Sequence, residues 1–169
     1  HARRRGAPIL AEIIGTGATA DAYHITAPHP EGRGASIVMR TALKEAGINT
    51  SDVDYINVHG TSTPLGDVAE LRAIQHVFGE DAYGLNISST KSMTGHLLGA
   101  SGAIEAVAGI LGMKHNFVPP TINHFTPDPE IDPKLNLTLN QPQERHLDII
   151  LSNTFGFGGH NSSIVLKRV

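Results

Sequence analysis

The segment STKSMTGHLLGASGAIEA, residues 89–106, decides how this chain folds and what it does, because it places Lys91 and His96 directly before an apolar helix. Glycine and alanine dominate that helix, which we predict over roughly residues 95–113. Small side chains let another backbone approach closely. Lys91 and His96 can both carry a positive charge, so their position at the start of such an apolar helix raises the question of a chemical role.

The segment VHGTSTPLGD, residues 58–67, repeats this arrangement. A strand predicted over 52–60 ends near His59, a Gly/Thr/Ser turn follows, and a helix is predicted over 63–79. Ligands of open α/β sheets gather outside the carboxyl ends of the strands. We therefore expect His59 and His96, with Lys91, to meet at one sheet edge. Either histidine alone could merely bond a backbone carbonyl, but this is less plausible for both.

The remaining elements complete an α/β domain with a mixed sheet, parallel through the crossovers and antiparallel at a closing hairpin. HARRRG, residues 1–6, has the cations and final glycine of a helix end. The proline-rich stretch 118–133 is predicted to be a loop. The other expected elements are strands over 8–21, 85–90, 135–140, 147–155 and 162–169, and a helix over 34–47.

One motif imitates a dinucleotide-binding site. Residues 15–20, GTGATA, have the Gly-x-Gly-x-x-Ala spacing, which binds a pyrophosphate only where a helix follows at once. Pro28 and Pro30 stand in the segment after it, so no helix begins there. We interpret these glycines as a bend in a strand.

Composition excludes several classes of function. The chain has 13 basic and 16 acidic residues, which gives no footprint for nucleic acid. It has no cysteine, and therefore no disulfide, zinc–thiolate site or cysteine nucleophile of its own. It contains no apolar run of membrane-spanning length and no signal-peptide pattern, so we expect a cytoplasmic location.

Two carboxylates and one turn also have candidate roles. Glu70 could reach Lys91, and such an ion pair would hold the loops that carry the histidines. Glu105 lies among apolar neighbours and needs a cation or several donors. The turn FGFGG, residues 155–159, could bring backbone N–H groups close to a developing oxyanion, while also serving as a hairpin turn.

The segments VHGTSTPLGD, SSTKSMTGHLLGASGAIEA and SNTFGFGGHN together resemble the C-terminal signatures of the β-ketoacyl-[acyl-carrier-protein] synthases, most closely the ketoacyl synthase II type. The resemblance covers essentially the whole chain. It implies the C-terminal half of a thiolase-like fold: a five-stranded mixed sheet with helices, half of an αβαβα sandwich. It also implies that residues 1–169 are a fragment, whose N-terminal half would carry the nucleophilic cysteine.

The resemblance implies a decarboxylative Claisen condensation of malonyl-acyl carrier protein with an acyl-enzyme thioester. Substrates would be carried on phosphopantetheine, with no bound cofactor. The partners would be acyl carrier protein, the missing half and, in the intact enzyme, a second copy in a homodimer. The fragment alone would be inactive.

The resemblance also assigns residues. The catalytic set would be His59 and His96, the supporting pair Lys91 and Glu70, and Phe157, whose N–H would be half of an oxyanion hole. Thr61 and Thr63 would bond pantetheine, and Phe155 would be a gate beside the acyl pocket. A monovalent cation site would involve Asn57, Glu105 and Asn153. The alternatives are a non-catalytic relative that binds acyl chains or pantetheine, and a generic α/β binding module.

Overall fold

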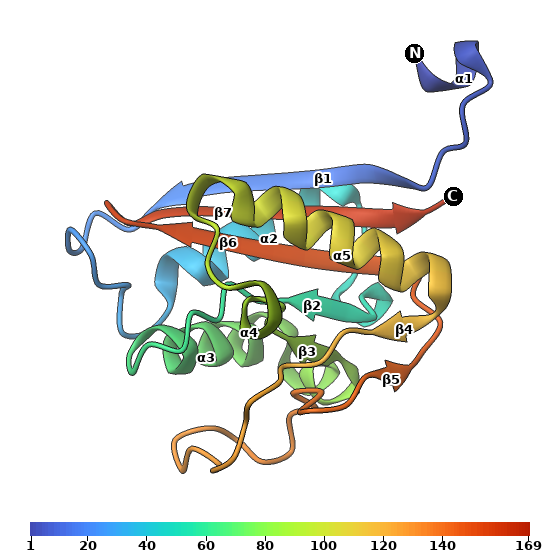
Figure 1. Ribbon diagram of the computed structural model, residues 1–169. Coiled ribbons are helices and arrows are strands. Elements are labelled where there is room, and N and C mark those ends of the chain that lie inside the picture. Colours follow the sequence, from blue (N-terminus) through green and yellow to red (C-terminus); the bar gives the residue numbers. More distant parts are fainter.

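The computed structural model describes residues 1–169 and has a five-stranded mixed sheet at its centre, in the order β1-β7-β6-β2-β3 (Figure 1). Strand β2 is parallel to β3 and β6, whereas β7 is antiparallel to β1 and β6. The α/β class, the parallel crossovers and the closing hairpin are therefore as predicted. The sheet strands are β1 (Ala11–Ala20), β2 (Tyr55–Asn57), β3 (Asn86–Ser88), β6 (Ile149–Gly156) and β7 (His160–Arg168).

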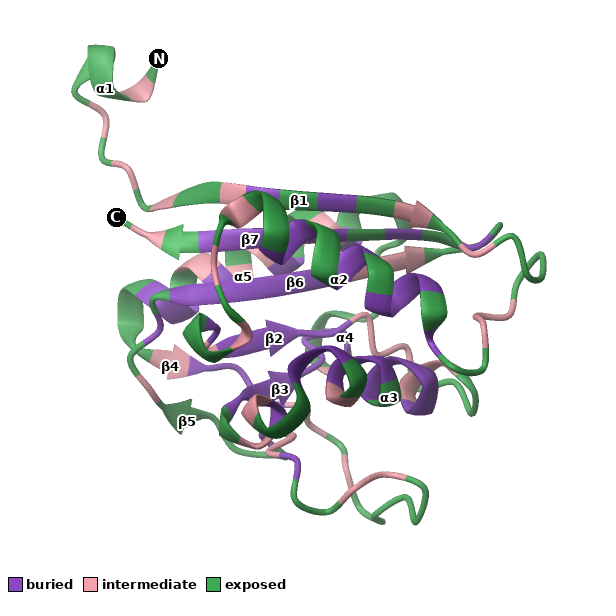
Figure 2. Ribbon diagram, turned by 180° about the vertical axis from the view of Figure 1, so that it is seen from behind, coloured by how far each residue is buried: buried purple, intermediate pink, exposed green.

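Helices cover both faces of this sheet (Figures 1 and 2). Helices α2 (Arg33–Ala46) and α3 (Gly66–Phe78) lie on one face, and α5 (Ser101–His115) lies on the other. None of the helices combines the length and apolar character that a bilayer crossing needs. The smaller elements are α1 (Ala2–Arg5), α4 (Lys91–Thr94), strands β4 (Phe117–Val118) and β5 (Gln143–Glu144), and three 3-10 turns over Thr50–Asp52, Gly79–Gly84 and Leu98–Ala100.

Each face of the sheet has its own apolar core. The larger core lies under α2 and α3, where Val38, Ile74 and Leu151 are fully shielded from solvent. The smaller one lies on the α5 side and is built around Tyr55 and Met113. Burial of such side chains contributes about 1.5–3 kcal/mol each, so both helical layers stabilise the strands that present the candidate site.

The glycines of GTGATA explain how α2 approaches β1. A Cβ on Gly15 would lie 2.3 Å from the carbonyl oxygen of Ala42, and one on Gly17 would lie 2.4 Å from that of Val38. The register also shifts between Ile13 and Gly15, so β1 is irregular at the first of these glycines. The motif is thus a helix-packing surface inside β1.

Gly15→Ala is expected to lower the free energy of unfolding by about 1–3 kcal/mol, or more if α2 cannot shift, because the new methyl group meets helix backbone. Gly99→Ala is the matched control, since nothing lies within 4 Å of a Cβ there. Urea denaturation of both variants measures the difference. Equal stability of the two would contradict this explanation.

The helix predicted over 95–113 begins later than expected. It starts at Ser101 and ends at His115, and the preceding residues form the short helix α4, an irregular segment and a 3-10 turn. Gly95 has φ 73° and Leu98 has φ 52°, values that an α-helix cannot accommodate. His96 therefore lies in a non-helical segment that leads into α5.

The strand predicted over 135–140 was wrong. This segment only touches the edge of the sheet, where Asn136 accepts a backbone hydrogen bond of 2.9 Å from Ile87. Thr138 has φ 48° and Asn140 has φ 62°, which interrupts an extended conformation. Alternating side chains therefore did not produce a strand, because the backbone turns twice within six residues.

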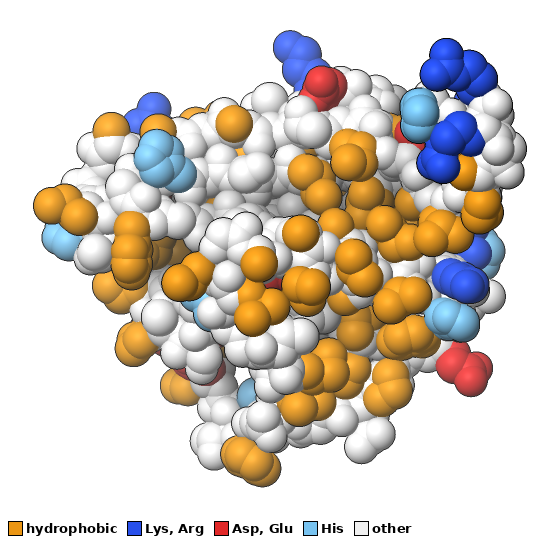
Figure 3. All heavy atoms as spheres, turned by 45° about the horizontal axis from the view of Figure 1, so that its top comes forward, with side chains coloured by type: hydrophobic (Ala, Val, Ile, Leu, Met, Phe, Trp, Pro, Cys, Tyr) orange, Lys and Arg blue, Asp and Glu red, His pale blue; other side chains and the backbone are white.

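The outer face of α5 is apolar and exposed. Ile104, Val107 and Leu111 are 39%, 51% and 44% exposed, although α5 is the most apolar helix of the chain. The space-filling view shows hydrophobic side chains gathered over this part of the surface (Figure 3). Contiguous apolar surface of this kind marks an interaction site.

Candidate active site

Three strands deliver the candidate site residues to one edge of the sheet. His59 follows β2, His96 follows β3 by way of α4, and Phe155 lies near the end of β6, which runs parallel to β2. The two imidazole rings lie edge to face, with 5.4 Å between their centroids. The Phe155 ring lies 5.5 Å from that of His59. The convergence expected from the two strand ends is present.

A cavity of about 710 Å³ opens at this edge. Lys91 is not among its lining residues and is instead buried, with 7% of its surface exposed. The cavity is therefore lined by imidazoles, hydroxyls and aromatic rings, whereas Lys91 is buried behind these side chains. The predicted site residues that line it are His59, Thr61, Thr63, Glu70, His96, Phe155 and Phe157.

Glu70 holds the loop that carries His59. Its two carboxylate oxygens accept the backbone N–H of His59 at 2.9 Å and that of Gly60 at 3.0 Å. A third bond of 3.1 Å comes from the side-chain amide of Asn153. Glu70 is thus a backbone anchor, since three donors meet one buried carboxyl group.

Lys91 is paired with a different carboxylate from the one expected. Its ammonium group forms a buried ion pair with Glu105 of α5, so the predicted Glu70–Lys91 pair is wrong. Glu70 belongs to α3 on one face of the sheet, whereas Glu105 lies near the start of α5 on the other face, where the ammonium group of Lys91 meets it. The pair fixes the start of the segment that leads to His96.

Strand β6 lies between these two anchors. Asn153 donates to Glu70 on the α3 side, and the next residue, Thr154, donates to Glu105 on the α5 side at 3.4 Å. Successive side chains of a strand point to opposite faces, which explains the division. One strand therefore supports both histidine loops.

Burial keeps the imidazole of His59 neutral. Desolvation, followed by the nearby charges of Lys91 and His96, lowers the pKa of His59 to about 3. Its Nδ1 atom is buried and has no hydrogen-bond partner in the chain. A neutral ring of this kind serves as an N–H donor or a base near pH 7.

Hydrogen bonds define the tautomer of His96. Its Nδ1 lies 3.3 Å from the backbone N–H of Leu98, which can only donate, and 2.9 Å from Oγ of Ser101. Because Nδ1 accepts, the proton of the neutral ring is on Nε2. His96 thus offers an N–H donor, and Ser101, which was not predicted, holds the ring.

The difference in unfolding free energy between the wild type and His59→Gln is expected to fall as the pH is lowered from 6.5 to 4. An unfolded histidine takes up a proton near its usual pKa of 6.5, but folded His59 does not until about pH 3. Its contribution is thus complete above pH 6.5 and is lost toward pH 3, with a limiting slope of about 1.4 kcal/mol per pH unit.

The raised pKa of Glu70 makes the free energy of unfolding depend on pH in the opposite direction. Burial raises its pKa to about 7, so its contribution is complete below pH 4.5 and is lost as the pH rises toward 7. The comparison with His59→Gln cancels this term, because glutamine keeps the backbone N–H that Glu70 holds. Urea titrations at four pH values measure the difference, and a pH-independent value would contradict a neutral His59.

The glycine turn after β6 is held by backbone hydrogen bonds to the segment that follows β1. The N–H of Gly158 donates to the carbonyl of Ile25 at 2.7 Å, and Gly159 accepts from the N–H of Asp21 at 2.8 Å. None of the hydrogen bonds outside the helices and strands is donated by the N–H of Phe157, whose ring is 79% exposed. This N–H is thus available at the rim of the cavity.

The turn between β2 and α3 brings two hydroxyls together. Oγ1 atoms of Thr61 and Thr63 lie 3.3 Å apart. Between them, Ser62 has φ 61° and donates its N–H to Asp67 at 3.0 Å, and Asp67 also lines the cavity. Asp67 was not singled out from the sequence, although an aspartate in the first turn of a helix commonly accepts such bonds.

The residues expected to hold a monovalent cation have other partners. Lys91 neutralises Glu105, which was to supply the site's charge. Asn153 bonds Glu70 and Ser163, and Asn57 bonds Thr90 at 3.2 Å. These contacts already engage the three side chains, and no chemistry below depends on a cation there.

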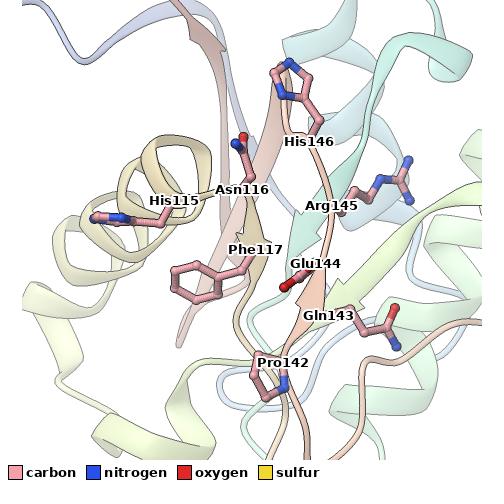
Figure 4. Close-up of a pocket in the computed structure, with 8 residues that line it drawn as sticks. All are labelled: His115, Asn116, Phe117, Pro142, Gln143, Glu144, Arg145 and His146. Carbon is pink, nitrogen blue, oxygen red and sulfur yellow. The ribbon is translucent and has the colours of Figure 1, made fainter.

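A second, more open cavity of about 800 Å³ lies beside the end of α5 and strand β5 (Figure 4). It contains none of the predicted site residues. Two of its lining side chains have partners within the chain, since Arg145 reaches Asp54 at 3.4 Å and His146 reaches Asp148 at 3.1 Å. Neither the lining residues of this cavity nor their contacts indicate a second catalytic centre.

Residues 10–125 match the family model described as the C-terminal domain of beta-ketoacyl synthase. The chain is 54% identical to 3-oxoacyl-[acyl-carrier-protein] synthase 2 of Staphylococcus aureus strain COL and 52% identical to that of Coxiella burnetii. The matches cover 99% and 100% of this chain but 40% of each relative.

Solved structures agree. A chain of the AntDE:AntF complex, a type II polyketide synthase acyl-carrier protein with its ketosynthase, superposes with a TM-score of 0.95 at 43% identity and covers 100% of this chain. A beta-ketoacyl synthase of Burkholderia phymatum gives 0.91 at 40% identity and the same coverage. The match covers 41% of the first structure's chain and 40% of the second's. The α/β fold is thus the thiolase-like fold of ketosynthases, and the chain belongs to the β-ketoacyl synthase family, whose C-terminal domain it contains.

Proposed function

We propose that this chain is the histidine-bearing half of a 3-oxoacyl-[acyl-carrier-protein] synthase, which lengthens acyl chains by decarboxylative condensation in fatty acid synthesis. The observation that carries the proposal is the pair of imidazoles, 5.4 Å apart, on one cavity. Relatives named 3-oxoacyl-[acyl-carrier-protein] synthase 2 support it, although the chain spans about 40% of their length.

The geometry supports the decarboxylation step. Malonyl thioester loses carbon dioxide, and the electron pair of the broken bond moves onto the thioester as an enolate. The Nε2–H of His96 and the neutral ring of His59 are suited to donate to that enolate oxygen. Preorganised donors aimed at a developing oxyanion are each worth a few kcal/mol of transition-state stabilisation.

The condensation step needs a group that this chain lacks. The enolate carbon attacks the acyl thioester carbonyl, a carbon–carbon bond forms, and the cysteine thiolate leaves. The chain contains no cysteine, so we propose that an N-terminal half supplies it. The Phe157 N–H would then be one donor to the tetrahedral oxyanion and the cysteine N–H the other.

The same proposal accounts for the remaining predicted residues. Thr61 and Thr63 would bond the pantetheine arm, and Phe155 would gate the acyl pocket. The exposed face of α5 would pack against the N-terminal half. The complete enzyme would be a cytoplasmic homodimer that receives its substrates from acyl carrier protein.

The test is product formation by the complete enzyme that contains residues 1–169. Acyl- and malonyl-acyl carrier protein are supplied, and mass spectrometry detects a 3-oxoacyl product two carbons longer. Residues 1–169 alone are expected to form none. Binding of acyl carrier protein substrates without decarboxylation or condensation would instead favour the alternative, a non-catalytic relative that holds acyl chains.

A further inference from the structure

The ring of His59 has no hydrogen bond that would fix its orientation from within the chain. Its Nδ1 is buried without a partner, and its ring otherwise meets the rings of His96 and Phe155. The backbone of the His59 loop must therefore provide much of the positioning. That backbone is held by Glu70, which accepts the N–H groups of His59 and Gly60.

Glu70 is in turn held by Asn153. The side-chain amide nitrogen of Asn153 donates to Glu70 Oε1 at 3.1 Å, the same oxygen that receives the His59 N–H. Both side chains are buried, with 0% of Asn153 and 3% of Glu70 exposed. An unmatched donor or carboxylate at this depth would cost free energy, so the orientation of the amide matters.

Strand pairing fixes that orientation. The β6–β7 register places Ser163 directly opposite Asn153, and the Ser163 hydroxyl donates to Asn153 Oδ1 at 2.6 Å. With Oδ1 of Asn153 accepting from Ser163, the amide nitrogen faces Glu70. Ser163 is 1% exposed, so water does not compete for this bond.

We infer that Asn153 and Ser163 are positioning residues: through Glu70 they fix the backbone of His59 and aim its ring at the reacting thioester. This rests on the function proposed above. The hydrogen bonds run from β7 through β6 and α3 to the His59 loop. Asn153, expected from the family resemblance to bind a cation, thereby has a different role.

Two substitutions and their combination test this network. Asn153→Asp places a carboxylate against Glu70, and Glu70→Gln removes an acceptor from the His59–Gly60 backbone. The double variant Glu70→Gln/Asn153→Asp restores the contact between positions 70 and 153, but its glutamine nitrogen then faces the His59 N–H, which shares Oε1 with Asn153 in the wild type. Each single variant is expected to accelerate hydrogen exchange of the His59 and Gly60 amides by about 10- to 100-fold. In the double variant the Gly60 amide is expected to recover its protection, because the glutamine oxygen takes the place of Oε2, whereas the His59 amide stays fast.

Ile56 in β2 and Asn161→Asp are the controls. The amide of Ile56 reports global opening, so its hydrogen-exchange rate should change only when the overall stability changes. Asn161→Asp makes the same chemical change opposite Asp21, which Asn161 contacts at 2.7 Å, away from Glu70. It should leave the amides of His59 and Gly60 protected relative to Ile56. Equal acceleration of all amides in the single variants, or none, would overturn the inference.

Activity is measured on the complete enzyme as malonyl decarboxylation. The single variants are expected to lower kcat by about 10-fold or more with KM little changed, and the double variant to remain low, because the His59 N–H still lacks its acceptor. Loosened amides with unchanged kcat would overturn the positioning role. If the wild type does not decarboxylate malonyl thioester, the proposed function fails, and the exchange pattern still decides whether the network holds His59.

Discussion

Malonyl decarboxylation by the complete enzyme is expected to fall by about 10²–10³-fold when His96 is replaced by alanine, the loss typical of removing one oxyanion donor. The bonds from Leu98 and Ser101 to Nδ1 leave the proton on Nε2, and alanine removes that donor from an exposed side chain, while the buried Ser101 hydroxyl keeps its bond from the N–H of Leu97. The rate is measured as carbon dioxide release from malonyl-acyl carrier protein.

A donor role for His96 is separable from a role as a base. His96→Gln keeps an N–H donor, so it should recover part of the rate that His96→Ala loses, whereas a base would be lost equally in both. His115→Ala is the control, because His115 lies at the far end of α5 beside the other cavity. Unchanged decarboxylation in His96→Ala would refute the enolate-binding role.

Lys91→Met is expected to lower the free energy of unfolding by about 3–5 kcal/mol, because it leaves the buried carboxylate of Glu105 without its cation. Side-chain exposure is 5% for Lys91 and 2% for Glu105, so water cannot replace the lost partner. Urea denaturation of residues 1–169 measures the effect.

Two further variants show that the effect comes from an unpaired charge. The double variant Lys91→Met/Glu105→Leu removes both charges and should cost much less than Lys91→Met alone. Arg72→Ala breaks the exposed pair with Glu130, 3.9 Å apart, and should cost no more than about 1 kcal/mol. A small effect of Lys91→Met would show that the pair does not anchor the His96 segment.

Local signals were sufficient for much of the fold. Gly6 and Gly47 end α1 and α2 in left-handed conformation, as helix-terminal glycines do. The runs of β-forming residues before His59 and Lys91 form parallel strands β2 and β3. Patterns failed where single residues adopt positive φ, as at Leu98 and Thr138, because side-chain alternation and helical spacing do not report such backbone turns.

The sequence alone determined which strand ends carry the histidines, because strand and helix signals are local and parallel strands end at a common edge. It also determined the family, through three long motifs in order. Only the tertiary structure decided which carboxylate serves which loop: Glu105 pairs with Lys91, and Glu70 holds the His59 backbone. Those pairings depend on how α3 and α5 cross opposite faces of β6, a long-range packing result that no local pattern encodes.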